Sequence, residues 1–320
     1  MPHIPSDHFD GTRFFNPGSP QAKGFLDALR WKLTTRSTPW SDGPRQVAAT
    51  VPPRSVDGAL CRVTLVNHST LLIQSAGRNI LTDPIYSERA SPVSWAGPRR
   101  YSQPGVRFED LPPIDMVLLS HNHYDHLDLP TLRRIAASHK PRFIVPLGVS
   151  PLLAANGIRT EPELDWWQAN GDITCLPAWH FSARGITDRN RTLWCSYWIA
   201  TPAGPVYFGA DSAFGSHYAE IRMRMGAPRL ALLPIGAYKP EWFMSPVHMS
   251  PSQAVEAHRI LEPERSLAIH WGTFPLADDG EREPVEDLER ALADQPGVPI
   301  FEALANGGVV ELSAVVLESK

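Results

Sequence analysis

The sequence has few cysteines and no long apolar run. Among its 320 residues are three cysteines, Cys61, Cys175 and Cys195, with no Cys-x-x-Cys spacing, which argues against a disulfide framework and against a zinc ribbon. No window approaches 18 uninterrupted apolar residues, so no membrane-spanning helix is expected. The first residues lack the basic start and apolar stretch of a secretory signal, and we therefore expect a cytoplasmic protein. A peripheral membrane contact stays open, because such a contact needs only a surface patch.

The chain also lacks an excess of charge of one sign. Thirty Lys and Arg stand against 34 Asp and Glu, a formal net charge of −4, whereas a dedicated nucleic-acid binder usually carries a clear basic excess. The sequence contains no G-x-x-x-x-G-K phosphate loop, no G-x-G-x-x-G after a strand and no G-x-S-x-G nucleophile elbow. We therefore expect no nucleic-acid partner and neither of the common nucleotide-binding or serine-hydrolase sites.

Two regions of the chain differ in composition. Residues 1–58 are rich in Pro, Gly, Ser and Arg, and we interpret them as an N-terminal arm that packs on the body or is partly mobile. Residues 59–320 alternate short β-prone runs with helical segments, which indicates a layered α/β (α+β) fold. Helices are expected at 21–33, 130–138, 252–261 and 286–293, and strands at 61–66, 71–74, 80–81, 116–119, 143–145, 173–176, 193–199, 206–208, 230–233, 267–269 and 308–317.

Metal-ligating side chains are concentrated directly after the apolar run 116–119. In Ser120-His121-Asn122-His123-Tyr124-Asp125-His126, four candidate ligands occupy six positions. A turning backbone can bring His121 and His123 to one centre and direct Asp125 and His126 to a second. Imidazole and carboxylate groups suit zinc, iron or manganese, and two neighbouring ions can clamp an in-line displacement. A solvated polar turn is the alternative, but so dense a string after an apolar strand favours a metal site.

Three further candidate ligands share this placement. His180, Asp211 and His270 each follow an expected strand closely, so they should face one edge of a sheet. Asp211 is the natural bridging carboxylate, because its two oxygens can each reach one ion. Taken singly, each residue could equally be a capping Asp or a core His; together with the His-rich turn they form a ligand set.

These residues resemble the signature of the metallo-β-lactamase superfamily, and the surrounding sequence is similar to that of the N-acylphosphatidylethanolamine-hydrolysing phospholipase D family. The resemblance covers about residues 60 to 295 and implies an αββα sandwich with two metals at one edge. The similar blocks are Leu81-Thr82-Asp83-Pro84, Arg89-Ala90-Ser91-Pro92, Gly97-Pro98-Arg99-Arg100, Leu111-Pro112-Pro113-Ile114-Asp115, Leu164-Asp165-Trp166-Trp167, Ile235-Gly236-Ala237-Tyr238 and Ala268-Ile269-His270-Trp271-Gly272-Thr273-Phe274.

The resemblance also implies roles for individual residues. The first metal would be held by His121, His123 and His180, the second by Asp125, His126 and His270, with Asp211 shared. His248 matches a family His near the reacting phosphate; a surface loop His is the alternative. The pattern departs at two places: Asn67 precedes His68 where Gly is expected, and Ala210-Asp211-Ser212-Ala213-Phe214 replaces the usual Gly-Asp-Thr-Gly-Tyr.

The implied activity is that of a dinuclear metal-dependent hydrolase, a phosphodiesterase of phospholipase D type acting on N-acylphosphatidylethanolamine-like phospholipids. A metal-bridging hydroxide would attack in line, with Asp125 orienting the water and His248 assisting the departing oxygen. The expected metal is Zn²⁺, with iron or manganese as alternatives, and Tyr124, Trp242 and Phe243 are predicted to contact the substrate. A metal-dependent lactonase or other ester or amide hydrolase, a non-catalytic metal-binding scaffold, and a homodimer all stay open.

Overall fold

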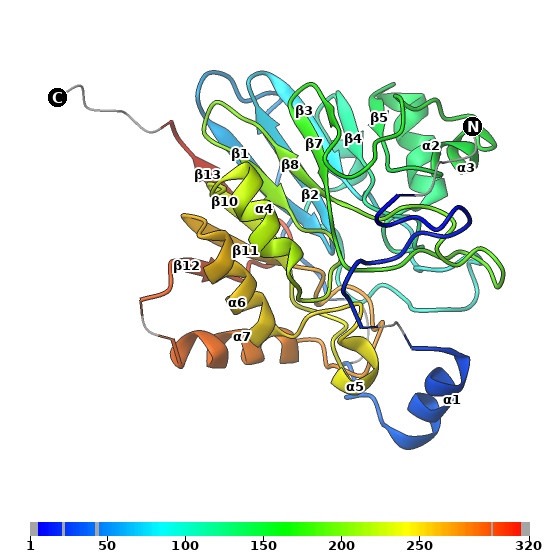
Figure 1. Ribbon diagram of the computed structural model, residues 1–320. Helices are drawn as coiled ribbons and strands as arrows, with labels where there is room; N and C mark the ends of the chain where they lie inside the picture. Colours follow the sequence, from blue (N-terminus) through cyan, green and yellow to red (C-terminus); the bar gives the residue numbers. More distant parts are fainter. Residues whose placement is uncertain (1–5, 21–22, 42–44, 296, 315–320) are drawn as a thin grey trace.

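The computed structural model describes residues 6–20, 23–41, 45–295 and 297–314 (Figure 1). Two mixed β-sheets have the strand orders β13-β1-β2-β3-β4-β5 and β12-β11-β10-β9-β8-β7-β6. The strands are β1 Cys61–Asn67, β2 Thr70–Ser75, β3 Arg78–Thr82, β4 Met116–Leu118, β5 Arg142–Ile144, β6 Ala169–Asn170, β7 Ile173–Leu176, β8 Ser196–Ile199, β9 Val206–Phe208, β10 Leu230–Pro234, β11 Arg265–Ile269, β12 Ile300–Glu302 and β13 Val309–Leu312. The helices are α1 Phe25–Thr34, the 3-10 turn η1 Phe108–Asp110, α2 Leu129–Ser138, α3 Ser150–Ala154, α4 His217–Met225, α5 Glu241–Met244, α6 Pro251–Leu261 and α7 Glu283–Ala293.

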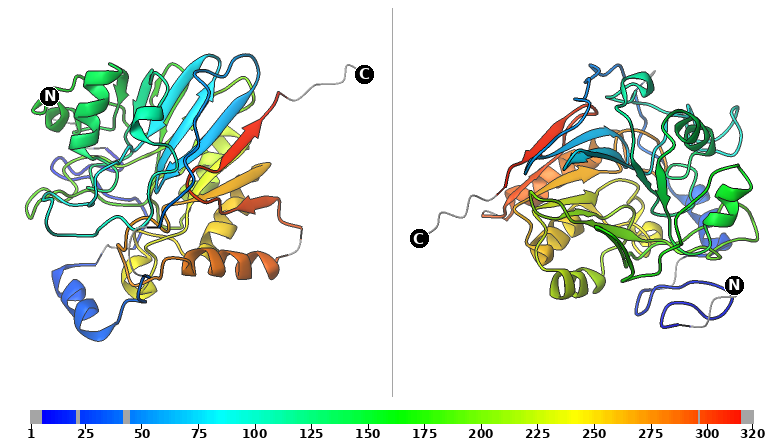
Figure 2. Two further views of the ribbon diagram at one scale, coloured as in Figure 1. Left: turned by 180° about the vertical axis from the view of Figure 1, so that it is seen from behind. Right: turned by 90° about the horizontal axis from the view of Figure 1, so that it is seen from above.

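Alternation along the strands divides the apolar side chains between three cores. In β10, Leu230 and Leu232 enter the core shared by the two sheets, whereas Ala231 and Leu233 face the helices, because successive side chains of a strand point to opposite faces. A second core lies under α2 and α3, and a third under α4, α6 and α7. The right-hand view of Figure 2 shows the two sheets as neighbouring layers. This arrangement confirms the predicted αββα sandwich.

Most of the expected elements are present, with shifted ends. Helix α6 begins at a capping box, in which the Ser250 side chain accepts a hydrogen bond from the Gln253 backbone. Helix α7 begins one turn earlier than expected, at Glu283, because Pro284 fits the first turn of a helix. Of the expected strand 308–317, residues 309–312 form β13 and 315–317 lie outside the described residues, as do residues 21 and 22 of the expected helix 21–33. Residues 193–195 precede β8 and are not part of it.

Other findings concern the cysteines and membrane-spanning segments. All three cysteines are free and buried. In the described part of the chain, no helix has the length and apolar character needed to cross a bilayer.

The N-terminal residues contact the body at widely separated points. His8 Nε2 lies 2.7 Å from Asp165 Oδ1. Asn16 donates a hydrogen bond to the His180 carbonyl at 2.8 Å and accepts one from Trp194 Nε1 at 2.8 Å. Trp31 Nε1 donates to Asp278 Oδ2 at 2.6 Å. One of these contacts is made by the backbone of a predicted metal ligand.

Candidate metal centre

The ends of strands from both sheets deliver the predicted ligands. His121 comes shortly after β4 in one sheet, while His180, Asp211 and His270 follow β7, β9 and β11 in the other. The site therefore lies where the two stacked sheets end together, rather than at the edge of one sheet as the sequence pattern had indicated. Strands β3 to β5 are parallel to one another, as are β9 to β12, so within each of these groups the carboxyl ends lie on the same side.

The backbone turns sharply just after four strands, β1, β3, β9 and β11. His68, Asp83, Ala210 and His270 have φ values of 49°, 34°, 49° and 60°, in or near the left-handed region that non-glycine residues rarely adopt. Ala210 is the position at which the family pattern has Gly, and the chain keeps a left-handed backbone there at a cost of roughly 1–2 kcal/mol. Backbone strain of this kind is concentrated at functional sites, where the surrounding structure holds it in place.

Three histidines form the first group of candidate ligands. His123 Nδ1 lies 2.9 Å from His121 Nε2 and 3.2 Å from His180 Nε2. Burial lowers the pKa of His123 to about 3 and that of His180 to about 4, so both rings are neutral at pH 7. His180 donates its Nδ1–H to the Val247 carbonyl at 2.8 Å, which leaves the lone pair of Nε2 directed at the cluster.

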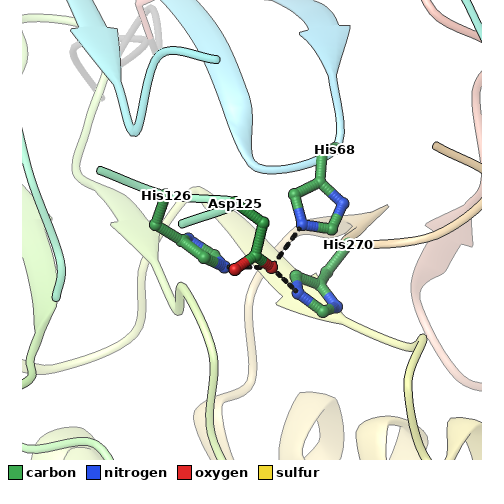
Figure 3. Close-up of side chains that lie close together, drawn as sticks. All are labelled: His68, Asp125, His126 and His270. Atoms are coloured by element: carbon green, nitrogen blue, oxygen red, sulfur yellow. Dashed lines mark hydrogen bonds and ion pairs between the residues drawn. The ribbon is translucent and has the colours of Figure 1, made fainter. Parts of the chain in front are cut away.

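The second group gathers around the Asp125 carboxylate (Figure 3). Asp125 Oδ2 lies 3.3 Å from His126 Nε2, 3.3 Å from His270 Nε2 and 3.0 Å from His68 Nε2. His126 donates its Nδ1–H to the buried Asp83 carboxylate at 2.7 Å, so its Nε2 lone pair is free for a metal. Asp83 thereby provides the carboxylate support that metal-ligating histidines usually have.

Asp211 joins the two groups. Its Oδ2 lies 3.1 Å from His270 Nε2, 3.2 Å from His126 Nε2 and 3.7 Å from His180 Nε2. Its Oδ1 is buried and has no hydrogen-bond partner among the described residues. A buried carboxylate oxygen without a partner, beside imidazole lone pairs, is costly for a protein alone and fits a cation. The residues present therefore fit a metal centre with the predicted seven ligands.

His68 belongs to this site, although the sequence reasoning considered it only as the neighbour of Asn67. It follows the first strand directly, as His270 follows β11, and that shared placement is the signal that could have identified it. The unusual Asn67 is used structurally: its Oδ1 accepts a hydrogen bond from the buried Arg100 at 3.1 Å, and its Nδ2 donates to the Ile85 carbonyl at 3.2 Å.

A cavity of about 320 Å³ opens onto the cluster. Of the predicted substrate contacts, Tyr124 and Phe243 line it, as does the predicted catalytic residue His248, whose Nδ1 lies 4.0 Å from Asp211 Oδ2. Trp242 is outside the set of described residues that line the cavity and is 37% exposed. Trp31 from the N-terminal region lines the cavity instead, a contribution that the sequence reasoning did not assign. Apart from the His and Asp ligands, the lining of the cavity is mainly apolar, so polar metal-ligating groups and an apolar wall face the same space.

Comparison with known proteins places this site in a family. The profile described as Beta-lactamase superfamily domain matches residues 78–271. The chain is 38% identical over 228 residues to N-acyl-phosphatidylethanolamine-hydrolyzing phospholipase D 1 of Caenorhabditis elegans, covering 67% of this chain and 64% of the worm protein. It is 35% identical over 243 residues to the mitochondrial N-acyl-phosphatidylethanolamine-hydrolyzing phospholipase D of Saccharomyces cerevisiae, covering 72% of this chain and 50% of the yeast protein.

A solved structure supports the same fold. Igni18, a metallo hydrolase from the archaeon Ignicoccus hospitalis, superposes with a TM-score of 0.59 at 22% identity, covering 79% of this chain and 99% of Igni18. The chain spans less than two thirds of the length of the worm and yeast relatives. The profile match and the relatives confirm the resemblance predicted from the motifs: the chain belongs to the beta-lactamase superfamily.

Proposed function

We propose that the chain is a dinuclear metal-dependent phosphodiesterase of phospholipase D type that acts on N-acylphosphatidylethanolamine-like phospholipids. One observation carries this proposal: seven His and Asp side chains converge, and four of them, His123, Asp125, Asp211 and His270, line a cavity whose walls are mainly apolar. Two groups of metal ligands suit the hydrolysis of a phosphodiester, and the apolar wall suits an acyl chain. The names of the worm and yeast relatives support this substrate class.

The proposed ligand assignment follows the two groups and the carboxylate between them. His121, His123 and His180 hold one ion, Asp125, His126 and His270 hold the other, and Asp211 serves both. The donor set accepts Zn²⁺, which we expect, and also iron or manganese. When bound, two such ions acidify a water molecule and neutralise negative charge that develops on a phosphate.

The residues of the chain itself position the reactants. Asp125 accepts a hydrogen bond from the attacking water and orients it. His248 faces the cavity beside Asp211 and donates a hydrogen bond or a proton to the departing oxygen. The bond between phosphorus and the ethanolamine oxygen breaks as the new bond between phosphorus and the water oxygen forms, giving a phosphatidate and an N-acylethanolamine. Tyr124, Trp242 and Phe243 are proposed to contact the substrate.

The organisation and surroundings of this site are part of the same proposal. Residues 59–320 form the hydrolase unit, and residues 1–58 form an arm that contributes Trp31 to the cavity. We expect a cytoplasmic protein that meets its substrate at a membrane surface, without nucleic acid. A homodimer is also predicted, and a measurement of the molecular mass in solution would test it.

The first experiment measures metal content per chain, together with hydrolysis of bis(p-nitrophenyl) phosphate and of an N-acylphosphatidylethanolamine before and after chelation. The proposal expects about two ions per chain and chelator-sensitive release of N-acylethanolamine from the lipid. In H₂¹⁸O, the label should enter the phosphatidate, because attack is at phosphorus.

The other outcomes separate the alternative functions. Two ions with turnover of lactones or carboxylic esters, but not of either phosphodiester, would assign the site to a carbonyl substrate. Metal binding without any turnover would favour a non-catalytic scaffold. A chain that binds no metal after reconstitution would exclude the mechanism.

A further inference from the structure

Helix α1 displays an apolar row to solvent. Leu26, Leu29 and Leu33 are 78%, 48% and 76% exposed, and their spacing places them on one side of the helix. Trp31, on the other side, is only 8% exposed. A surface helix of a soluble protein normally turns its apolar residues toward the core. In α1 the three leucines instead point away from the protein.

Hydrogen bonds and a ring contact fix helix α1 to the body of the protein. Three donors of this segment converge on one buried carboxylate: Trp31 Nε1, Thr35 Oγ1 and Ser37 Oγ bind the Asp278 oxygens at 2.6, 2.6 and 2.8 Å. The Trp31 ring also packs on Phe243, with 4.8 Å between ring centroids. The leucine row therefore has a defined orientation relative to the body.

The helix that carries the row lies beside the metal cavity. Helix α1 neighbours α5 in Figure 1 and in the left-hand view of Figure 2, and Trp31 and Phe243 of these two helices both line the cavity. Trp242, also on α5, is 37% exposed, and the Arg30 guanidinium lies over its ring at 5.0 Å from the centroid. Exposed Trp and Leu side chains thus lie on the two helices that contribute Trp31 and Phe243 to the cavity wall.

The charge of this segment is opposite to that of the chain. The whole protein carries −4, whereas residues 23–36 contain a single acidic residue, Asp27, and four basic residues, Lys23, Arg30, Lys32 and Arg36. Basic side chains beside a row of leucines, with a Trp at the border, are the combination that binds the surface of an anionic bilayer. A purely apolar protein partner would not require this concentration of positive charge.

We propose that α1 docks on the surface of an anionic phospholipid bilayer. Leu26, Leu29 and Leu33 enter the boundary between headgroups and acyl chains, and the basic residues contact anionic headgroups. This contact holds the cavity, which Trp31 and Phe243 line, close to the lipid. The proposal rests on the proposed function for the identity of the lipid substrate, but docking itself is measured without turnover.

The test compares binding of the metal-loaded full chain to vesicles of phosphatidylcholine with phosphatidylglycerol and to vesicles of phosphatidylcholine alone. The variant is L26S/L29S/L33S, and the control is V51S/M223S, which removes exposed apolar side chains outside α1. We expect the α1 variant to lose vesicle binding by about tenfold or more, and the control to bind as the unaltered chain does. Hydrolysis of soluble bis(p-nitrophenyl) phosphate and the melting temperature should be the same for all three proteins.

Several results would overturn the proposal. Vesicle binding that is equal in the α1 variant and the control would exclude the leucine row, and equal binding to both vesicle types would exclude the charge contribution. A change from dimer to monomer in L26S/L29S/L33S, with no vesicle binding by the unaltered chain, would assign the row to an interface between copies.

The same measurements separate failure of docking from failure of the proposed function. Hydrolysis of the N-acylated lipid in detergent micelles without vesicle binding would overturn docking alone. Leucine-dependent vesicle binding without hydrolysis of that lipid would support docking and overturn the substrate assignment.

Discussion

His68 donates a hydrogen bond from Nε2 to Asp125 Oδ2 over 3.0 Å (Figure 3). His126 and His270 approach both Asp125 and Asp211, so their Nε2 lone pairs are placed for a metal. Burial lowers the pKa of His68 to about 3, so the ring is neutral and can carry its single proton on Nε2. With the Nε2 atoms of His126 and His270 on a metal, His68 would be the imidazole that still supports Asp125 as a donor.

Replacing His68 should weaken the second metal position selectively. His68→Met removes the donor at similar volume, and we expect affinity for the second ion to fall about 10- to 100-fold, while the His121, His123 and His180 group still binds the first ion. His68→Gln keeps an N–H donor and should retain most of the affinity. Calorimetric metal titration and metal content per chain check this. Equal losses in both variants would instead indicate that His68 is itself a ligand.

Asp211 should be required by both ions. Its carboxylate contacts imidazoles of both groups, so Asp211→Ala should reduce metal content at both positions and lower turnover of bis(p-nitrophenyl) phosphate by more than about a hundredfold. Asp211→Asn keeps the shape and tests whether the negative charge is needed. Full activity of Asp211→Ala with metal still bound would refute the bridging role.

His248 should act on turnover rather than on metal binding. We expect His248→Ala to keep about two ions per chain and to lower kcat by roughly 10²–10⁴-fold, the usual contribution of a general acid. A phosphodiester with a better leaving group should recover part of the loss, because it needs less protonation. Turnover unchanged from that of the unaltered protein would make His248 a bystander, and loss of metal would make it a ligand.

The two metal positions should respond differently to pH. In the metal-free protein burial disfavours charge on His270, but Asp211 and Asp125 outweigh burial and raise its pKa to about 9. The same carboxylates raise the pKa of His126 well above its usual value. Because a metal must displace these protons, affinity for the second ion should increase as pH rises from 7 toward 9, by about tenfold per pH unit for each proton released.

The first position provides the internal control for this pH dependence. His123 and His180 have pKa values lowered by burial to about 3 and about 4, so no proton has to leave them above pH 7. Affinity for the first ion should therefore change little over the same range. Metal titrations at several pH values measure both affinities, and parallel slopes for the two ions would contradict the assignment of protons to His126 and His270.

Local sequence patterns were sufficient to predict the ligands that come shortly after a strand. An apolar run followed within a few residues by His or Asp marked His121, His180, Asp211 and His270, because short strands and the residues after them are local features. The same rule applies to His68, but there no second ligand type stands nearby to make the pattern distinctive. Helix α4 was not expected, since His217, Tyr218 and Ile221 are buried without a regular apolar stripe, and Met223 is exposed.

The ligand types, their order along the chain and the layered α/β class could be predicted from the sequence, because they depend on periodicity and on residues adjacent in the chain. Which side chains lie together depends on the packing of the whole fold. That packing joined the ends of two sheets into one centre, placed His68 behind Asp125, and brought Trp31 to Phe243 across more than 200 residues. Such long-range contacts depend on how whole layers pack, which no local pattern encodes.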